Sequence, residues 1–186
     1  MHTADVYEVR VRGDWHVFIL DEKTGTFASY GTFGTYAYQW QAIGDRTLKQ
    51  FVAGLDFDYF MNKAKEGSYT EFDAEKTIVQ MKDRVLDMRR WEELTKEQAR
   101  EAWRELTVLP SLLDWEDDES EFYKEAFNRE AVVRAFNSPV DCSRGTRVNA
   151  QCRGFWDKMW PKFLEQIREI DLGSSDPYDI ETYEGH

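Results

Sequence analysis

Cysteine and histidine are scarce in this sequence, which contains two and three of them among its 186 residues. Nine residues separate Cys142 from Cys152, while His2 and His186 lie at the extreme ends of the chain. A structural zinc site needs four ligands in closely spaced pairs, and this set does not supply them. His16 has no second histidine or cysteine at ligand spacing. We therefore interpret it as a strand residue of a sheet rather than as a catalytic group or metal ligand.

A reactive thiol is the minority alternative for Cys142. Arg144 lies two residues away, and a neighbouring cation lowers the pKa of a thiol. A nucleophilic cysteine also needs a nearby base, and within the body of the chain only His16 offers one. We expect both cysteines to be loop or core residues.

Long apolar runs and nucleotide-binding glycine motifs are also missing. No apolar run reaches the roughly 18 residues that a membrane span requires, and residues 1–5 lack the basic-then-apolar order of a signal peptide. These absences predict a cytoplasmic protein with reduced thiols and no membrane partner. The glycines match neither a Walker loop nor a dinucleotide fingerprint, and no Gly-x-Ser-x-Gly or His-Glu-x-x-His pattern occurs. We expect no cofactor.

Basic residues are outnumbered, 24 against 36 acidic ones, for a formal net charge of −12. Residues 71–186 hold 27 acids and 17 bases, whereas residues 1–70 hold nine and seven. Such a chain is disfavoured from binding nucleic acid directly or lying on anionic lipid. It favours a basic protein partner or mimicry of nucleic-acid charge, with plain solubility as the alternative interpretation.

The aromatic residues that make up 15% of the chain indicate a real hydrophobic core. Residues 6–12, 15–20, 26–31 and 36–40 are rich in β-formers and are separated by short turns, which predicts a four-stranded antiparallel sheet. Two short helices follow at residues 48–55 and 57–64. Asp45 and Asp56 stand where their N-caps are expected.

From about residue 70 the apolar spacing becomes helical. A stripe of apolar residues from Ala74 to Met88 predicts one long helix, and a Thr95–Gln98 capping box begins the next. A last helix carries Phe155 and Phe163, and Pro161 either starts or kinks it. The predicted class is α+β. The predicted domains are residues 1–68 (sheet and short helices), 69–170 (a helical region on or beside it) and 171–186 (an acidic flexible tail).

An acidic segment in the helical region is the candidate partner-binding site. Its residues are Asp114, Trp115, Glu116, Asp117, Asp118, Glu119 and Glu121. Carboxylates steer a basic surface into place, and a large aromatic supplies buried contact area once it arrives. A solvated charge run is the alternative interpretation.

Three aspartates offer a metal-dependent alternative. Asp45, Asp56 and Asp58 supply the oxygen ligands that Mg²⁺ prefers. Helix capping explains Asp56 and Asp58 at least as well, because a negative side chain near a helix N-terminus is stabilised by the positive end of the helix dipole. We expect no bound metal here and no enzymatic activity.

Part of the sequence resembles a known group of proteins. The pattern Tyr36-x-Tyr38-x-Trp40-x-x-Ile43-Gly44-Asp45, with its neighbours in roughly the first 65 residues, is similar to a family of small, mostly uncharacterised phage and prophage proteins. The resemblance transfers no catalytic residue, but it implies a context: small acidic phage proteins are often inhibitors of host machinery, including anti-CRISPR and other anti-defence proteins.

The leading hypothesis is a phage-encoded acidic binding protein in the host cytoplasm. Its partner would be a bacterial protein with a basic nucleic-acid-binding surface. The alternatives are a small metal-dependent enzyme that uses the three aspartates, and a self-assembling structural phage protein.

Overall fold

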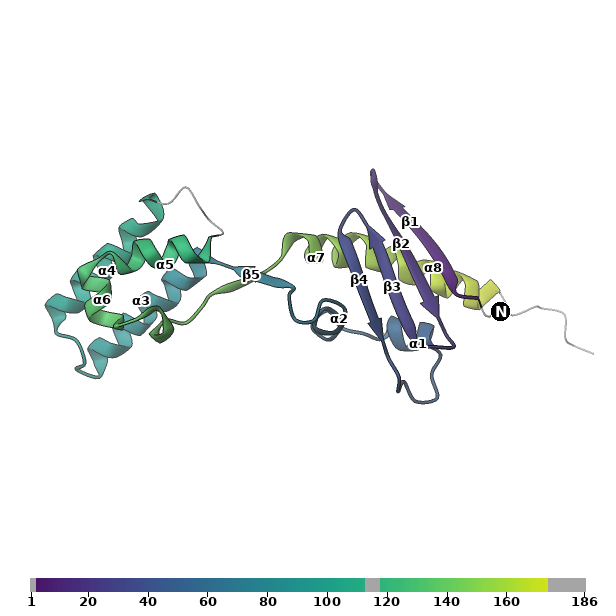
Figure 1. Cartoon of the computed structure of the whole chain (residues 1–186), viewed down its shortest axis with the longest axis horizontal. Coiled ribbons are helices and arrows are strands. Elements are labelled where there is room, and N and C mark those ends of the chain that lie inside the picture. Colours follow the sequence, from purple (N-terminus) through teal and green to yellow (C-terminus); the bar gives the residue numbers. More distant parts are fainter. Residues whose placement is uncertain (1–2, 113–117, 174–186) are drawn as a thin grey trace, which may run out of the picture. The chain divides into compact units, whose positions relative to one another are not determined.

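The computed structural model of the chain describes residues 3–112 and 118–173. They belong to two compact units (Figure 1). The sheet unit combines residues 1–69 with residues 149–186, and the helical unit comprises residues 70–148. The α+β class predicted from the sequence is confirmed. The first segment of the sheet unit ends at residue 69, and residues 149–170 lie in the sheet unit rather than in the helical region where the sequence analysis placed them.

The sheet has the predicted antiparallel order. Its four strands are β1 (Asp5–Val11), β2 (Asp14–Asp21), β3 (Thr26–Gly31) and β4 (Gly34–Gln39), each hydrogen-bonded to the next along the chain. Alternate residues of each strand are buried, among them Tyr7, Phe18, Phe27 and Tyr36. These buried side chains form the inner face of the sheet.

Glycine is required at position 25, where the turn before β3 lies against the backbone of Trp40. Gly25 precedes β3 with a φ of +67°, and a Cβ at this position would lie 2.2 Å from the carbonyl oxygen of Trp40. The same backbones are joined by a hydrogen bond of 2.9 Å from Trp40 N to Gly25 O. Any larger residue would force these two segments apart.

Two short helices follow the sheet, α1 (Leu48–Ala53) and α2 (Phe57–Ala64). The N-cap of α1 is Thr47 and not Asp45 as predicted: Thr47 Oγ1 accepts a hydrogen bond from Gln50 N, and the Gln50 side chain accepts one from Thr47 N, both 3.2 Å. Glu22 accepts hydrogen bonds from the next two backbone amides. The reciprocal box needs its two residues three positions apart, and Asp45 lies too early for that.

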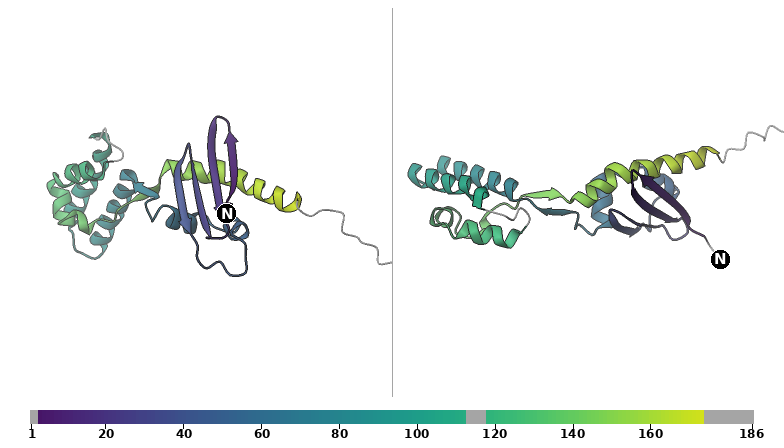
Figure 2. Two further views of the ribbon diagram at one scale, coloured as in Figure 1. Left: turned by 45° about the vertical axis from the view of Figure 1, so that its right-hand side comes forward. Right: turned by 90° about the horizontal axis from the view of Figure 1, so that it is seen from above.

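The C-terminal segment returns to cover the inner face of the sheet (Figure 2). It consists of α7 (Ala150–Gly154), a π-helical turn (Phe155–Met159) and α8 (Trp160–Gly173). Phe163 stacks on Phe18 with ring centroids 4.1 Å apart, and Phe155 stacks on Tyr36 at 4.0 Å. These rings explain why residues 149–170 do not join the helical unit.

Pro161 is the second residue of α8 and lies in its first turn, so the helix starts at this proline, one of the two roles predicted for it. The π-helical turn lies directly before it, and wider turns of this kind accommodate positions where the regular hydrogen-bond ladder is broken. Because proline lacks the N–H that would bond four residues back, the segment continues through Pro161 with one bond fewer.

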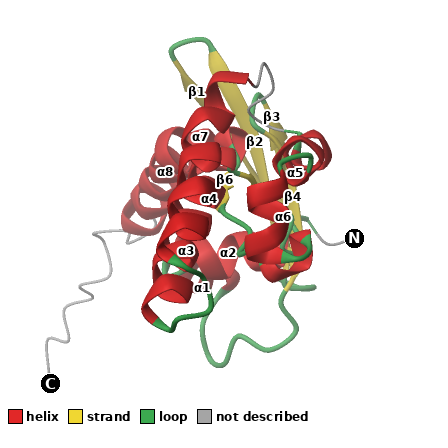
Figure 3. Cartoon of the chain, turned by 90° about the vertical axis from the view of Figure 1, so that its left-hand side faces the viewer, coloured by secondary structure: helices red, strands yellow, loops and turns green. Residues whose placement is uncertain are grey.

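The helical unit opens and closes with two short paired strands, β5 (Thr70–Phe72) and β6 (Thr146–Val148), which the sequence analysis did not predict. Between them lie α3 (Ala74–Arg90), α4 (Lys96–Val108), η1 (Leu109–Leu112), α5 (Glu119–Phe127), α6 (Glu130–Phe136) and η2 (Pro139–Asp141) (Figure 3). The predicted capping box at Thr95 and Gln98 is confirmed.

The core of the helical unit follows the apolar stripes of these helices. Met81 and Val85 of α3 and Leu106 of α4 are almost completely buried, together with Phe122 of α5 and Val132 of α6. Across residues 3–112 and 118–173, the helices are too short or too polar to cross a membrane.

Candidate functional site

The acidic segment is partly described by the structure. Asp114, Trp115, Glu116 and Asp117 lie outside the described residues. The remaining three predicted partner-binding residues, Asp118, Glu119 and Glu121, form the N-terminal end of α5. Negative charge is favourable at this end of a helix because the backbone dipole is positive there.

Each of these three carboxylates also has a partner within the protein. Asp118 is the N-cap of α5, and its Oδ1 accepts hydrogen bonds from Ser120 N at 2.9 Å and Glu121 N at 3.1 Å. Glu119 accepts a hydrogen bond from Arg144 Nε at 2.8 Å, and Glu121 pairs with Lys124 at 3.4 Å. The segment therefore holds its own helix together in addition to any role with a partner.

The Glu119–Arg144 pair remains accessible from solvent. The two side chains are 39% and 45% exposed. Exposed ion pairs of this kind contribute about 0–1 kcal/mol to stability.

Other carboxylates of the helical unit are paired with arginines as well. Glu101 pairs with Arg134 at 3.4 Å, and Glu105 pairs with Arg129. Pairing lowers the local potential but does not remove the surplus, because residues 70–148 contain 19 acids against 13 bases. Residues 114–121 contain six acids and no base, which equals the whole surplus of the helical unit, because its other residues contain 13 acids and 13 bases.

The three aspartates of the metal hypothesis are engaged in local structure. Asp56 is the N-cap of α2, with Oδ1 accepting a hydrogen bond from Tyr59 N at 2.8 Å, as predicted. Asp58 lies in the first turn of α2, and Asp45 is exposed in the loop before α1. Within the described part of the chain, no three or more His, Cys, Asp or Glu side chains are grouped to hold a metal ion.

The capping role of Asp56 leads to a test. We expect Asp56→Ala to lower the free energy of unfolding by about 1 kcal/mol, because the Tyr59 amide loses its acceptor. Asp56→Asn should cost less than about 0.5 kcal/mol, since asparagine is an equally good N-cap. Urea unfolding measures both values. Equal losses in the two variants, or heat released on titration with Mg²⁺, Mn²⁺ or Zn²⁺, would contradict this role and favour a bound metal.

Neither cysteine has the surroundings of a reactive thiol. Burial raises the pKa of the Cys142 thiol to about 12, and the carboxylate of Asp141 adds to the shift. The expected influence of Arg144 is absent because its guanidinium is hydrogen-bonded to Glu119. Cys152 is only 3% exposed. The interpretation of both as structural residues agrees with the structure.

His16 is buried completely in the sheet unit. Its ring lies among Phe18, Tyr36 and Phe155, with centroids 5.2, 6.0 and 4.9 Å away. Neither ring nitrogen has a hydrogen-bond partner of normal geometry within the described residues. Burial lowers the pKa of His16 to about 4, partly opposed by the Trp15 backbone. The side chain is therefore neutral near pH 7 and has no group to exchange a proton with.

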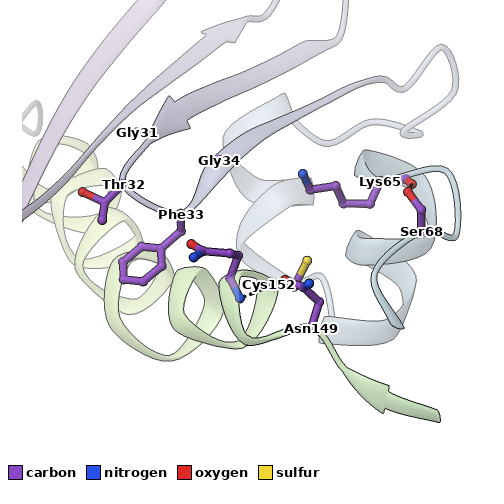
Figure 4. Close-up of a pocket in the computed structure, with 9 residues that line it drawn as sticks. Gly31, Thr32, Phe33, Gly34, Lys65, Ser68, Asn149 and Cys152 are labelled. Carbon is purple, nitrogen blue, oxygen red and sulfur yellow. Dashed lines mark hydrogen bonds between the residues drawn. The ribbon is translucent and has the colours of Figure 1, made fainter. Parts of the chain in front are cut away.

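A shallow pocket of about 390 Å³ lies in the sheet unit beside the β3–β4 hairpin (Figure 4). Residues 31–34 form one wall, Lys65 and Ser68 another, and Asn149, Gln151 and Cys152 a third. The Lys65 ammonium lies 4.5 Å from the centroid of the Tyr36 ring.

No histidine or carboxylate is among the residues that line this pocket. Lys65 and Cys152 are its titratable side chains. Sequence reasoning missed it, because its walls come from segments far apart in the chain.

These observations define an α+β protein whose described residues form a sheet unit and a helical insertion. Asp56, one of the three aspartates considered as metal ligands, caps α2. The chain matches the model of a phage family over residues 1–169. It therefore belongs to that phage family, and the match extends well beyond the first 65 residues. Comparisons with curated proteins and with solved structures gave no significant match.

Proposed function

We propose that this phage-family protein is a non-enzymatic binding protein that inhibits a bacterial host protein. The proposed partner is a nucleic-acid-binding defence component, such as a CRISPR or restriction protein. The inhibitor occupies the basic surface that the partner uses for nucleic acid. The observation that carries this proposal is the surplus of 19 acids over 13 bases in residues 70–148.

Charge of this sign and density suits a basic partner. Nucleic-acid-binding proteins present clustered lysines and arginines that bind successive phosphates. Residues 114–121 and nearby acids offer carboxylates in their place, and the exposed Glu119 keeps only a weak ion pair with Arg144. Long-range attraction between the two surfaces raises the rate of association and weakens as salt screens it.

The family assignment places this chain among phage proteins, and a phage gains by blocking host defence proteins that bind nucleic acid. Within the described residues, no group of His, Cys, Asp or Glu is assembled to hold a metal ion, and no histidine or carboxylate lines the pocket beside the β3–β4 hairpin. The proposal of binding rather than catalysis rests on the acidic surplus.

Charge neutralisation tests the proposal. The full chain, immobilised, should capture host proteins from a nuclease-treated bacterial lysate, and mass spectrometry should identify basic nucleic-acid-binding proteins among them. We expect the triple variant Asp114→Asn, Glu116→Gln, Asp117→Asn to bind the purified partner about 3- to 150-fold more weakly at 0.1 M salt, from the sum of three lost contacts. Each lost exposed contact removes about 0.2–1 kcal/mol. The α5 cap, Asp118, is left intact in this variant.

A matched control separates the segment from net charge. The variant Asp45→Asn, Glu66→Gln, Glu165→Gln removes the same three charges from the sheet unit and should bind almost as tightly as the wild type. In a gel-shift assay the wild-type protein should release nucleic acid from the partner. Unchanged affinity of the triple variant at low salt, or a partner that keeps its nucleic acid when bound, would overturn the proposal.

A further inference from the structure

The outer face of the sheet is largely apolar, and within the described residues several of its side chains are exposed. We use this name for the side of β1–β4 opposite the inner face. One of its cross-strand rows consists of Val6, Ile19, Ala28 and Ala37, which are paired across the four strands in register. The aromatic contacts of α2, α8 and the π-helical turn involve the inner face instead. Val6 is consequently 64% exposed.

Two large aromatic side chains stand on the same face. Trp15 of β2 and Tyr30 of β3 are 39% and 47% exposed, and their rings meet edge to face with centroids 6.0 Å apart. Soluble proteins rarely leave aromatic and branched side chains together on one open surface unless that surface binds something. Tyrosine and tryptophan are also the residues that contribute most where proteins meet.

This face carries almost no net charge, unlike the chain as a whole. Three cross-strand rows of this face begin at Val6, Glu8 and Arg10 of β1. They contain two charged side chains, Glu8 and Arg10, which form an ion pair with each other. A basic partner gains nothing from such a surface. A second copy of the same surface meets no uncompensated charge on it.

The dimensions also fit a second copy. Four strands at a spacing of about 4.8 Å and six residues at about 3.4 Å give a footprint of about 19 by 20 Å, near 400 Å² for each copy. The two copies together would bury about 800 Å², which is below the roughly 1,200–2,000 Å² of a standard specific interface and in the range of weak or transient contacts. A contact of this size supports a weak dimer.

We propose that two copies of this protein bind through their outer sheet faces, as an aligned two-fold sandwich. Flat sheets pack face to face about 10 Å apart with strands rotated by about 30°, and a two-fold arrangement brings the same patch of each copy together. The small residues Ala28 and Ala37 leave room for Ile19 of the other copy.

Sedimentation velocity of the full chain tests this dimer between 5 and 300 µM. We expect the weight-average mass to rise with concentration from near 22.0 kDa towards twice that value, as for a weak, transient contact. Raising NaCl from 0.05 to 0.5 M should strengthen the dimer several-fold, because two chains of charge −12 repel each other and salt screens the repulsion. The proposed partner complex should respond to salt in the opposite direction, so failure of either proposal leaves the other testable.

Three lysine substitutions of equal charge locate the interface. Tyr30→Lys and Val6→Lys should each weaken the dimer at least tenfold, although both reduce the overall repulsion. Val140→Lys, at a side chain of the helical unit that is 92% exposed, should leave it unchanged. Circular dichroism checks that each variant is folded. If Tyr30→Lys is unfolded, the result for Val6→Lys is the one that tests the proposal. A monomer at 300 µM in 0.5 M NaCl, or a dimer that both sheet variants retain, would overturn the proposal.

Discussion

Replacing Phe163 by alanine is expected to lower the free energy of unfolding of the sheet unit by about 3–5 kcal/mol, the usual cost of removing a buried phenylalanine. Phe163 is completely buried. Its ring stacks on Phe18 with an interplanar angle of 3° and meets the edges of Tyr7 and Phe27 at 5.5 and 6.2 Å. Alanine removes all three contacts at once and leaves a cavity.

Urea unfolding and amide hydrogen exchange measure this effect. The amides of β2 and β3 should exchange faster in Phe163→Ala, while those of α3 and α4 should keep their protection. Trp91→Ala is the control, because Trp91 is 75% exposed and its loss should cost less than about 0.5 kcal/mol. Loss of protection in α3 and α4 with an unchanged sheet would show that the C-terminal helix does not stabilise the sheet unit.

The second large effect is a loss of stability in acid that comes from His16. Its pKa is lowered from 6.5 to about 4 by burial, so the unfolded chain binds a proton at higher pH than the folded one. The stability that the neutral ring contributes is fully present above pH 6.5 and declines as the pH falls towards 4. At 1.36 kcal/mol for each pKa unit, the loss amounts to about 3 kcal/mol.

Comparison with His16→Phe isolates this contribution, because carboxylates titrate in the same range in both proteins. Phenylalanine retains an aromatic ring among Phe18, Tyr36 and Phe155 but cannot take up a proton. Unfolding free energies measured at pH 7, 6, 5 and 4 should converge or cross as the wild type loses about 3 kcal/mol more than the variant. Parallel pH profiles would mean that His16 becomes protonated as readily in the folded protein as in the unfolded one.

The sheet and its helix caps were predictable because their signals are local. Strand alternation repeats every two residues and capping boxes involve residues three apart, so neighbours in the sequence suffice. Thr95–Gln98 and Asp56 were predicted in this way. The Asp45 prediction was wrong for a related reason: three polar residues in a row compete for one cap, and backbone geometry selects Thr47.

The placement of the last helix was not predictable. Its apolar stripe, with Phe155 and Phe163, can pack on any apolar surface. The helices of residues 70–148 are nearest to it in the sequence, so the prediction placed it with them. The paired strands β5 and β6 were missed because each has only three residues, too few for a periodic pattern. The pocket beside Lys65 was missed since no local motif joins its walls.

By itself, the sequence determined the four strands of the main sheet, most of the helices, the sign of the charge and the absence of common catalytic motifs. Each of these depends on composition or on residues close together in the chain. Only the tertiary structure decided that residues 149–173 complete the sheet unit, that Arg144 pairs with Glu119, and that several side chains of the outer sheet face are exposed. Those outcomes depend on which surfaces bury the most apolar area against each other, a competition between segments far apart in the sequence.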